Sequence, residues 1–283
     1  MNEMKGKLNY ILNSNIFFLL EVLKKMEKTG IETIRVNEVA STLLELGLQK
    51  DDTTIIKLVK KTLKIQTMGS GWIGIGETIN SLKLLSFYRN RHMKQIEDAI
   101  DWYYSCQNAD GGLGRFKEDR SRIPVCWRVL ESLYYDKIEI NDRIMQIIKW
   151  METEWKKDMI RGGLSYKCAG ILIANHYYPY FSEKFIKRTL EWLLKDQNYD
   201  GGWGPKKGAP VGSVPSYTGL ALRAVLYHGD AKSRNVGKSI NNGIRWIIIN
   251  RLKNGLWKEH PAEKALIEIS LFLDKYLKNS PNL

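Results

Sequence analysis

Charged residues recur at one position of several apolar segments, where they could take part in acid–base chemistry or ion pairing. We align these segments on two threonines and two cysteines, namely Thr78, Cys126, Cys168 and Thr218. The residues five positions later are, in the same order, Lys83, Glu131, Ile173 and Arg223. A buried charge must be paired or face water, so Glu131 either pairs with Lys83 or Arg223, or helps to form the polar floor of a ligand pocket. Glu131 is the candidate catalytic residue, and Lys83 and Arg223 are candidate substrate-binding residues.

The elements that would position these residues form a repeat. Trp192–Gly204 has the sequence WLLKDQNYDGGWG and Trp102–Gly114 has WYYSCQNADGGLG, with looser copies at Trp150–Leu164 and Trp246–Trp257. The residues that follow the turn glycines are separated by 41, 51, 39 and 53 residues. They are Trp72, Leu113, Leu164, Trp203 and Leu256. Each interval holds an apolar helix and then an amphipathic helix, which predicts helical hairpins that must stack on one another.

The hydrophobic spacing predicts an all-α chain, without any strand alternation. The first helices of the hairpins are expected at Thr78–Tyr88, Val125–Tyr135, Tyr166–Tyr177, Ser216–Tyr227 and Ala262–Tyr276. The second helices are expected at Met93–Cys106, Asp142–Trp155, Ser182–Asp196 and Lys238–Arg251. Residues 1–68 form a less regular helical segment of the same domain, and residues 69–283 hold the repeats. The N-terminal segment is either one more hairpin with a cap or a helix-turn-helix module at Val36–Ile65.

The turn motif itself is expected to be structural. Its glycine pairs allow a positive φ, which ends a helix and reverses the chain. Gln107 and Gln197 are expected to satisfy orphan backbone groups at the end of a neighbouring helix. Trp203 is expected to stack on that glutamine or to fill the gap between hairpins.

The pattern of apolar helix, Gln, short spacer and Gly-Gly-Trp resembles the QW motif of squalene–hopene cyclases and other class II terpene cyclases. The wider family includes the β subunits of protein prenyltransferases. The resemblance covers about residues 69–275, and it implies an α/α toroid whose inner helices surround an apolar cavity for an isoprenoid. Trp127, Tyr166 and Tyr217 are the aromatic residues expected to reach that cavity and bind the substrate. Five hairpins are few for a closed ring, so the sequence leaves open whether the ring closes.

The catalytic motifs of the resembling families are missing from this chain. Class II cyclases protonate an alkene with a DxDD motif, and the sequence contains no such motif. Its adjacent acids Asp51 and Asp52 are expected to form a solvated helix cap. Prenyltransferases bind zinc with an Asp, a Cys two residues later and a His. Cys126 falls at the Cys position but Pro124 replaces the Asp, so we expect buried thiols and no metal site.

The resemblance also suggests a way to bind a diphosphate. Prenyltransferases hold this group with basic residues that follow a glycine-rich turn. Here Arg115, Lys117 and Lys206 follow such turns and precede predicted helix N-termini, which suit an anion. The alternative is a pair of solvated basic loops. No cofactor is certain, and Mg²⁺ would be expected only if the substrate is a prenyl diphosphate.

Composition limits the remaining choices. The chain has 283 residues, 43% of them hydrophobic, and its three cysteines show no CxxC spacing, which favours a reducing compartment. We find no convincing signal peptide and no apolar run of membrane-spanning length, so we expect a cytoplasmic location. The net charge of +13 is spread over scattered lysines. Such a distribution is most typical of a solvated surface. A membrane surface is a further possible partner of these charges, and nucleic acid is a less favoured one.

We therefore expect a terpene cyclase- or prenyltransferase-like protein that binds an isoprenoid or prenyl diphosphate and that could convert it with non-standard catalytic residues. The competing hypotheses are a catalytically inactive toroid that serves as a protein-interaction scaffold and a basic adaptor that contacts nucleic acid.

Overall fold

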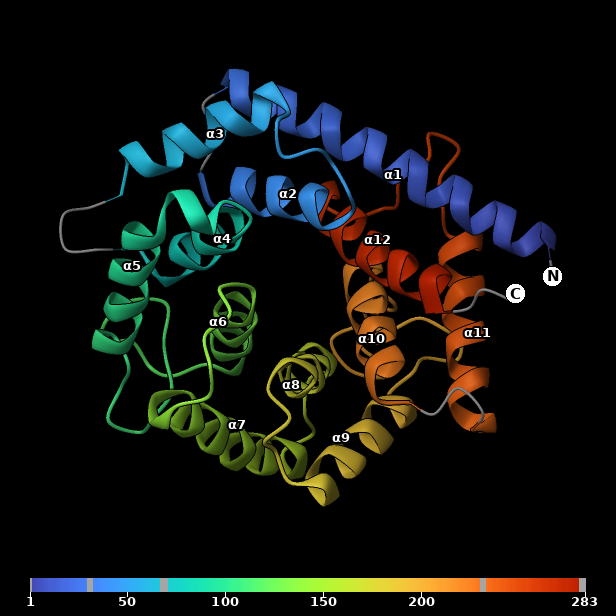
Figure 1. Cartoon of the computed structure of the whole chain (residues 1–283). Helices are drawn as coiled ribbons and strands as arrows, with labels where there is room; N and C mark the ends of the chain where they lie inside the picture. Colours follow the sequence, from blue (N-terminus) through green and yellow to red (C-terminus); the bar gives the residue numbers. More distant parts are fainter. Residues whose placement is uncertain (1, 30–32, 67–70, 230–232, 280–283) are drawn as a thin grey trace. The chain divides into compact units, whose positions relative to one another are not determined.

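The computed structural model describes residues 2–29, 33–66, 71–229 and 233–279, and the regular elements of these residues are all helical (Figure 1). The helices before the first glycine turn are α1 (Asn2–Thr29), α2 (Thr33–Glu45) and α3 (Thr53–Lys64). The first helices of the following hairpins are α4 (Ile75–Ser86), α6 (Ile123–Tyr135), α8 (Ser165–Tyr177), α10 (Pro215–His228) and α12 (Ala262–Asn279). The second helices are α5 (Met93–Ser105), α7 (Asp142–Ile160), α9 (Glu183–Lys195) and α11 (Arg234–Ile249), and a short 3₁₀ helix, η1 (Arg89–Arg91), precedes α5.

The two helices of a hairpin differ in how they are buried, as their sequences predict. In α10, ten of fourteen residues are buried, because the helix is packed by α9, α11 and α12. In α9 the buried residues are only Phe185, Thr189 and Leu193, which lie four positions apart along one stripe. A first helix must therefore be apolar on most sides, whereas a second helix needs one apolar face.

Each tryptophan at the end of a turn is held by the helix before it. The indole Nε1 groups of Trp72, Trp203 and Trp257 donate to backbone carbonyls at 2.9, 3.0 and 3.0 Å. The acceptors are Thr62, Leu193 and Ile247, in each case ten residues earlier. The alignment on Leu256 was thus wrong by one residue, because Trp257 is the structural equivalent of Trp203. The bond from Trp72 also makes α2 and α3 a further hairpin, which packs on α4.

The same turn residues are held by the helix after them. The backbone N–H groups of Trp72 and Trp203 donate to the hydroxyls of Thr78 and Thr218, both at 3.0 Å. The N–H of Leu113 donates to the thiol sulfur of Cys126 at 3.3 Å. These bonds confirm the predicted register for α4, α6 and α10, whereas Cys168 on α8 donates to the Thr189 carbonyl instead. They also give Cys126 a structural role.

The glutamines of two turn motifs, Gln107 and Gln197, connect neighbouring second helices. The side-chain amide of Gln107 donates to the carbonyl of Arg143 in α7 at 3.0 Å, and that of Gln197 donates to the carbonyl of Ser239 in α11 at 3.0 Å. The prediction of a contact with a neighbouring helix is confirmed. The prediction that the partners are orphan groups is wrong, because carbonyls near a helix N-terminus lie inside the helical hydrogen-bond pattern.

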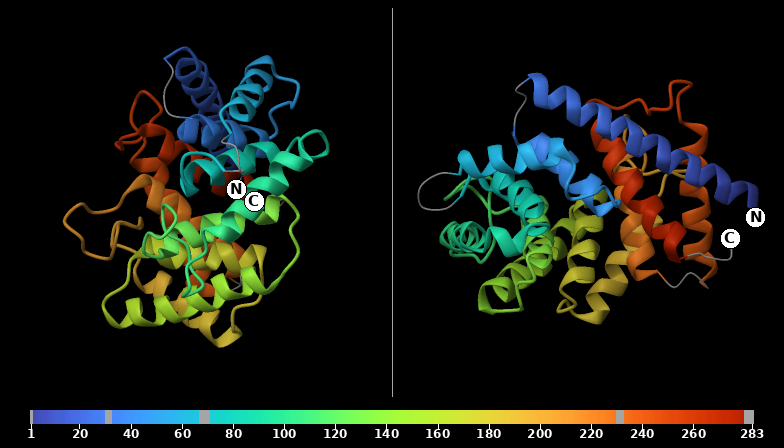
Figure 2. Two further views of the ribbon diagram at one scale, coloured as in Figure 1. Left: turned by 90° about the vertical axis from the view of Figure 1, so that its left-hand side faces the viewer. Right: turned by 45° about the horizontal axis from the view of Figure 1, so that its top comes forward.

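The chain divides into two compact units. Unit 1 contains residues 1–22, 158–176 and 182–283, and unit 2 contains residues 23–157 and 177–181. In unit 2, α4 packs against α2 and α6. In unit 1, α10 packs against α12, and α1 runs beside α12, where the amide of Asn15 donates to Ser270 Oγ at 3.1 Å (Figure 2). The boundary predicted between residues 68 and 69 lies outside the described residues.

Two turn glycines of unit 1 allow the contribution of close packing to be separated from that of backbone strain. Gly162 and Gly201 have similar positive φ values of 87° and 95°. A Cβ atom at Gly162 would meet nothing within 4 Å, whereas a Cβ atom at Gly201 would lie 2.7 Å from the carbonyl oxygen of Asn242. We expect Gly162→Ala to lower the free energy of unfolding by about 1 kcal/mol and Gly201→Ala to lower it by about 3 kcal/mol or more. Urea denaturation measures both, and equal losses would contradict the packing argument.

Candidate functional site

A group of buried charges joins three helices of unit 2. The ammonium group of Lys83 on α4 lies 3.1 Å from Glu45 Oε2 on α2 and 3.7 Å from Glu131 Oε1 on α6. The side chains of Lys83, Glu45 and Glu131 are only 9%, 13% and 6% exposed. The predicted pair of Lys83 with Glu131 is therefore confirmed, and a second carboxylate completes it.

The positions of these residues follow from the packing of the helices. Glu45 ends α2, Lys83 lies in the last turn of α4, and Glu131 lies in the second half of α6. Because α4 packs against both α2 and α6, the three side chains meet. A cation in the last turn of a helix is also favoured by the partial negative charge of the helix end.

Tyrosines surround the charged group. The hydroxyl of Tyr177 donates to Glu131 Oε1 at 3.2 Å, and Lys83 Nζ lies 4.7 Å from the centre of the Tyr135 ring. Burial, together with the carboxylates of Glu45 and Glu131, raises the pKa of Tyr135 far above its usual value. Tyr135 therefore remains a neutral hydroxyl at physiological pH.

Tyr135 and Tyr177 also belong to an aromatic pocket, which we call the tyrosine pocket. Its volume is about 710 Å³. It is lined by five tyrosines, Tyr134, Tyr135, Tyr177, Tyr178 and Tyr180, by Ile138, Ile140 and Pro179, and by two charged residues, Lys137 and Glu139. The ring centroids of Tyr134 and Tyr177 lie 4.7 Å apart, and Tyr134 is 47% exposed. The pocket thus offers a mostly apolar surface directly beside the buried charges.

Sequence reasoning did not identify these tyrosines or Glu45 as site residues. A signal was available for the tyrosines, because each first helix was predicted to end at a tyrosine, including Tyr135 and Tyr177. No comparable signal marked Glu45, because a glutamate at the end of an amphipathic helix is usually solvated.

The chemistry of Glu131 follows from its neighbours. An ammonium group at 3.7 Å and a donated hydroxyl both favour a charged carboxylate over a neutral acid. Protonation of an alkene needs a carboxylic acid that is both protonated and strongly acidic. The contacts of Glu131 are thus those of a buried ion pair.

A second unusual carboxyl group lies at the C-cap of α6. Asp136 is fully buried, and burial raises its pKa to about 8, although Arg89 acts in the opposite direction. The Arg89 guanidinium lies 3.9 Å from Asp136 Oδ1 and also donates to the Asp136 carbonyl. At neutral pH this carboxyl group is mostly protonated, but it is too weak an acid to protonate an alkene.

The predicted basic loops belong to different units. Arg115 and Lys117 are exposed residues of unit 2, and Lys206 is an exposed residue of unit 1. Asp119 lies in the first loop, where it accepts from the Arg115 backbone N–H at 2.8 Å and pairs with Arg122 at 3.4 Å. Part of the positive charge of this loop is therefore compensated locally.

The other predicted site residues are placed as follows. Tyr166 and Tyr217, both in unit 1, stack with ring centroids 5.6 Å apart, whereas Trp127 is a buried residue of unit 2. Arg223, only 2% exposed, lies 3.6 Å from Glu268 Oε2 on α12 of its own unit. Among the described residues, the ion pair of Glu131 is with Lys83 and that of Arg223 is with Glu268.

The cysteines and the acidic pair behave as structural groups. Burial raises the pKa of the Cys126 thiol to about 12, and the Cys168 thiol donates to the Thr189 carbonyl at 3.2 Å. Asp52 caps α3 by accepting from the backbone N–H groups of Thr54 and Ile55 at 2.9 and 3.2 Å, which confirms the predicted cap. Within the described parts of the chain, no group of three or more His, Cys, Asp or Glu side chains is arranged to hold a metal ion.

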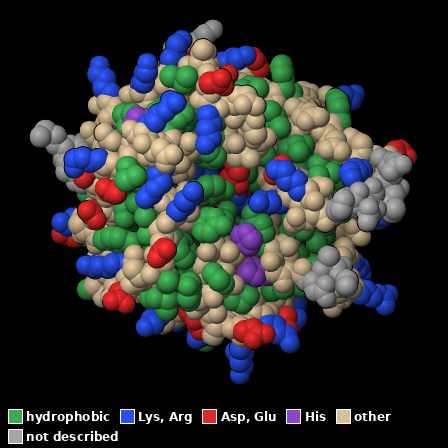
Figure 3. All heavy atoms as spheres, in the orientation of Figure 1, with side chains coloured by type: hydrophobic (Ala, Val, Ile, Leu, Met, Phe, Trp, Pro, Cys, Tyr) green, Lys and Arg blue, Asp and Glu red, His purple; other side chains and the backbone are tan. Residues whose placement is uncertain are grey.

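The surface carries its positive charge in a dispersed form. Figure 3 shows lysine and arginine side chains scattered over the viewed face, with acidic side chains between them. None of the helices, as far as the chain is described, has the length and apolar character needed to cross a bilayer.

The protonation of Asp136 predicts how stability depends on pH. The folded-state pKa of about 8 lies above the usual value of 3.8, so the folded protein keeps a proton that the unfolded chain loses, and stability falls as the pH rises from about 4 to about 8. We expect Asp136→Asn to remove this loss and to be more stable than the wild type at pH 8.5 by about 2–4 kcal/mol, with little difference at about pH 4. Urea denaturation at both pH values measures the difference. A difference in stability between the two proteins that does not widen with pH would contradict the assignment. Asp101→Asn, at an exposed position of α5, is the control.

Comparison with known proteins agrees with this architecture. The model of the prenyltransferase alpha-alpha toroid domain matches residues 74–256. A squalene–hopene cyclase of Zymomonas mobilis is 26% identical over 214 residues, and a dammaradiene synthase of Dryopteris crassirhizoma is 29% identical over 120 residues. These matches include 62% and 35% of this chain, but only 31% and 18% of the two relatives, so the chain spans about a third or less of their length.

Solved structures show the same fold. A structure of the type II terpene cyclase MstE from Scytonema, in complex with its substrate geranylgeranyl dihydroxybenzoate, matches with a TM-score of 0.72 and 13% identity over 100% of both chains. At this identity the likeness establishes the fold alone. The predicted fold class and the predicted resemblance to terpene cyclases are both confirmed, and the chain belongs to the prenyltransferase alpha-alpha toroid domain family.

Proposed function

We propose that the protein binds an isoprenoid chain in the tyrosine pocket. The observation that carries the proposal is the position of five tyrosines around a volume of about 710 Å³, next to the buried group of Glu45, Lys83 and Glu131. Pockets of this size hold small-molecule ligands, and aromatic rings supply a large apolar surface at little cost in conformational entropy. The geranylgeranyl compound bound by the Scytonema cyclase supports an isoprenoid as the ligand class.

We further propose that Glu131 acts on this ligand as a counter-charge. Glu45 and Glu131 both lie within 4 Å of the Lys83 ammonium group, so carboxylate groups lie close to the tyrosine rings. Such a site favours positive charge on a ligand, and aromatic faces add to this effect. It does not supply the strong acid that starts a class II cyclisation, so the proposed activity is binding without protonation by Glu131.

The remaining candidate residues form a second proposal. Within unit 2, Arg115, Lys117 and Trp127 are proposed to contact a substrate. Lys206, Tyr166, Tyr217 and Arg223 are proposed to do so within unit 1, and each set is considered by itself. Magnesium enters this proposal only for a prenyl diphosphate. A protein or membrane partner and a cytoplasmic location stay predictions from the sequence.

Binding can be tested with geranylgeraniol, an uncharged isoprenoid, by the quenching of intrinsic fluorescence. We expect Tyr134→Ser to weaken binding about tenfold, because it removes one aromatic wall, worth roughly 1.4 kcal/mol of contact. Tyr134 is half exposed, so the protein should still fold. Tyr199→Ser is the matched control, because Tyr199 is 100% exposed and does not line the pocket. Absence of binding, or an equal effect of the two substitutions, would overturn the proposal.

Conversion can be tested in the same samples by extracting the ligand and analysing it by mass spectrometry. We expect geranylgeraniol to be recovered unchanged from the wild type, because Glu131 is held as a carboxylate. A cyclised product that disappears in Glu131→Gln would show that Glu131 is a proton donor and would refute the counter-charge assignment.

A further inference from the structure

The outward face of α3 in unit 2 carries four exposed lysines, Lys57, Lys60, Lys61 and Lys64. The last three follow the first by three, four and seven positions, so all four lie on one side of the helix. The opposite side is apolar and packs against α2 and α4. Most of the positive charge of the chain is dispersed, but here one helix concentrates it.

The charges of these four lysines are not compensated within their helix. α3 contains no acidic residue, and none of the four forms an ion pair with any described part of the chain. Lysines three or four positions apart on a helix repel each other, and the stripe contains four such pairs. The negative end of the helix favours the two lysines of the last turn but not the two before them. A repulsion that the helix does not offset points to an external partner with negative charge.

The second helices of the other hairpins do not share this pattern. On α9 the exposed residues Lys187 and Arg188 are accompanied by Glu183 and Glu191, one helical turn before and after Lys187. α5 and α7 contain ion pairs between residues three or four positions apart. α11 has no acidic residue either, but its three basic residues are spread along the helix. A concentrated basic face is therefore not a general property of these helices.

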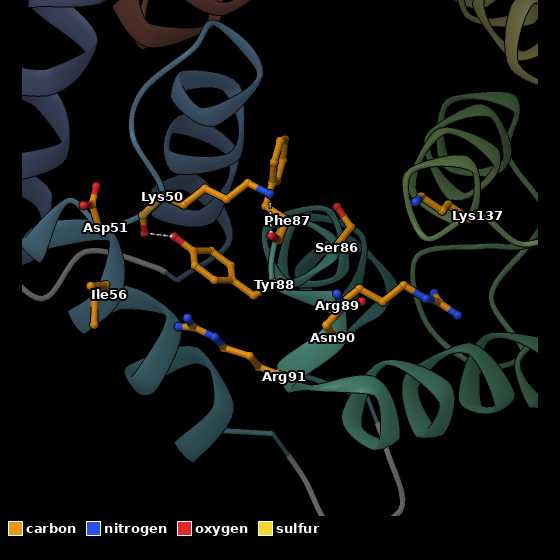
Figure 4. Close-up of a pocket in the computed structure, with 10 residues that line it drawn as sticks. All are labelled: Lys50, Asp51, Ile56, Ser86, Phe87, Tyr88, Arg89, Asn90, Arg91 and Lys137. Carbon is orange, nitrogen blue, oxygen red and sulfur yellow. Dashed lines mark hydrogen bonds between the residues drawn. The ribbon is translucent and has the colours of Figure 1, made fainter.

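Arg91 of η1 adds a fifth cation beside α3. It is exposed and lines the same surface pocket as Ile56 of α3, and Figure 4 shows its side chain extended toward α3 and away from Arg89. Lys50 does not join this group, because its ammonium group donates to the Phe87 carbonyl at the end of α4, at 2.9 Å (Figure 4). We call the following five residues the α3 surface: Lys57, Lys60, Lys61, Lys64 and Arg91.

The chemistry of the α3 surface distinguishes between classes of negatively charged partner. Protein interfaces are depleted in lysine and rely on a core of large apolar residues, whereas α3, which is described throughout, exposes no large apolar side chain. A helix that enters a membrane surface needs an apolar face toward the lipid, and the apolar face of α3 is buried in the protein. Single-stranded nucleic acids stack their bases on exposed aromatic rings, which α3 also lacks. The phosphate backbone of a duplex, in contrast, is bound mainly by cations.

We propose that the α3 surface binds the phosphate backbone of a nucleic-acid duplex. The seven positions from Lys57 to Lys64 extend over about 10 Å of helix axis. A duplex carries one negative charge per about 1.7 Å of its axis, so about six phosphate charges fall within this length. Lysine contacts to phosphates carry no sequence information, so we expect binding that does not depend on base sequence. This proposal goes beyond the isoprenoid proposal and does not rest on it.

The salt dependence of duplex binding by the full chain tests the proposal, measured by fluorescence anisotropy with a labelled DNA duplex of about 20 base pairs. For the wild type, we expect the logarithm of the association constant to fall with the logarithm of the salt concentration with a slope of about −4. The double variant Lys60→Gln/Lys61→Gln should change this slope to about −2 and weaken binding about tenfold or more at low salt, because each lost phosphate contact removes about one unit.

The matched control is Lys187→Gln/Arg188→Gln, which removes the same charge from two adjacent exposed positions of α9. We expect this control to keep the slope and the affinity of the wild type. Thermal unfolding checks the folding of both variants. The unfolding midpoint should rise in Lys60→Gln/Lys61→Gln, because the substitutions remove repulsion within α3.

Several results would refute the proposal. These are no binding of the duplex at about 50 mM salt, equal slopes in the two double variants, or binding of poly-glutamate as tightly as the duplex, which would show attraction to any negative polymer. Vesicles that contain phosphatidylserine test the membrane: binding to them that depends on Lys60 and Lys61, while duplex binding does not, would assign the α3 surface to a lipid surface instead. A lower unfolding midpoint in Lys60→Gln/Lys61→Gln would contradict the repulsion on which the argument rests.

Discussion

The structure depends on the hydrogen bonds that fix Trp72 and Trp203 between two helices. At Trp72 and Trp203 the indole donates to the second helix before the turn, while the backbone N–H donates to a threonine hydroxyl of the first helix after it. Both indoles are buried, so each bond is made away from water and would be costly to lose. The turn therefore determines where the next helix begins along its axis, and stacking can repeat this geometry from hairpin to hairpin.

This register has a chemical consequence in unit 2. Because Thr78 and Cys126 hold equivalent places, the residues five positions later lie at equivalent levels of α4 and α6, and Lys83 meets Glu131 there. The tyrosines at the ends of α6 and α8 then lie beside this pair. A constraint that is structural at the turn thus decides which charged and aromatic side chains come together at the far ends of the helices.

The sequence predicted the hairpins well because their signals are local. Glycines, apolar spacing and the residues around the turns lie close together in the chain, so the helices, the register and the pair of Lys83 with Glu131 could be inferred. Glu45 could not be inferred, because its partner Lys83 lies in another hairpin and depends on the packing of α2 on α4. Leu256 was chosen over Trp257 because the last turn has one glycine where the others have two.

The central claim is that Glu131 is a carboxylate held by Lys83, which makes this site one for binding and not for proton donation. Infrared difference spectroscopy of wild type against Glu131→Gln at neutral pH tests it most directly. The account predicts that the substitution removes the bands of an ionised carboxylate. Loss of the carbonyl band of a protonated carboxylic acid would contradict it.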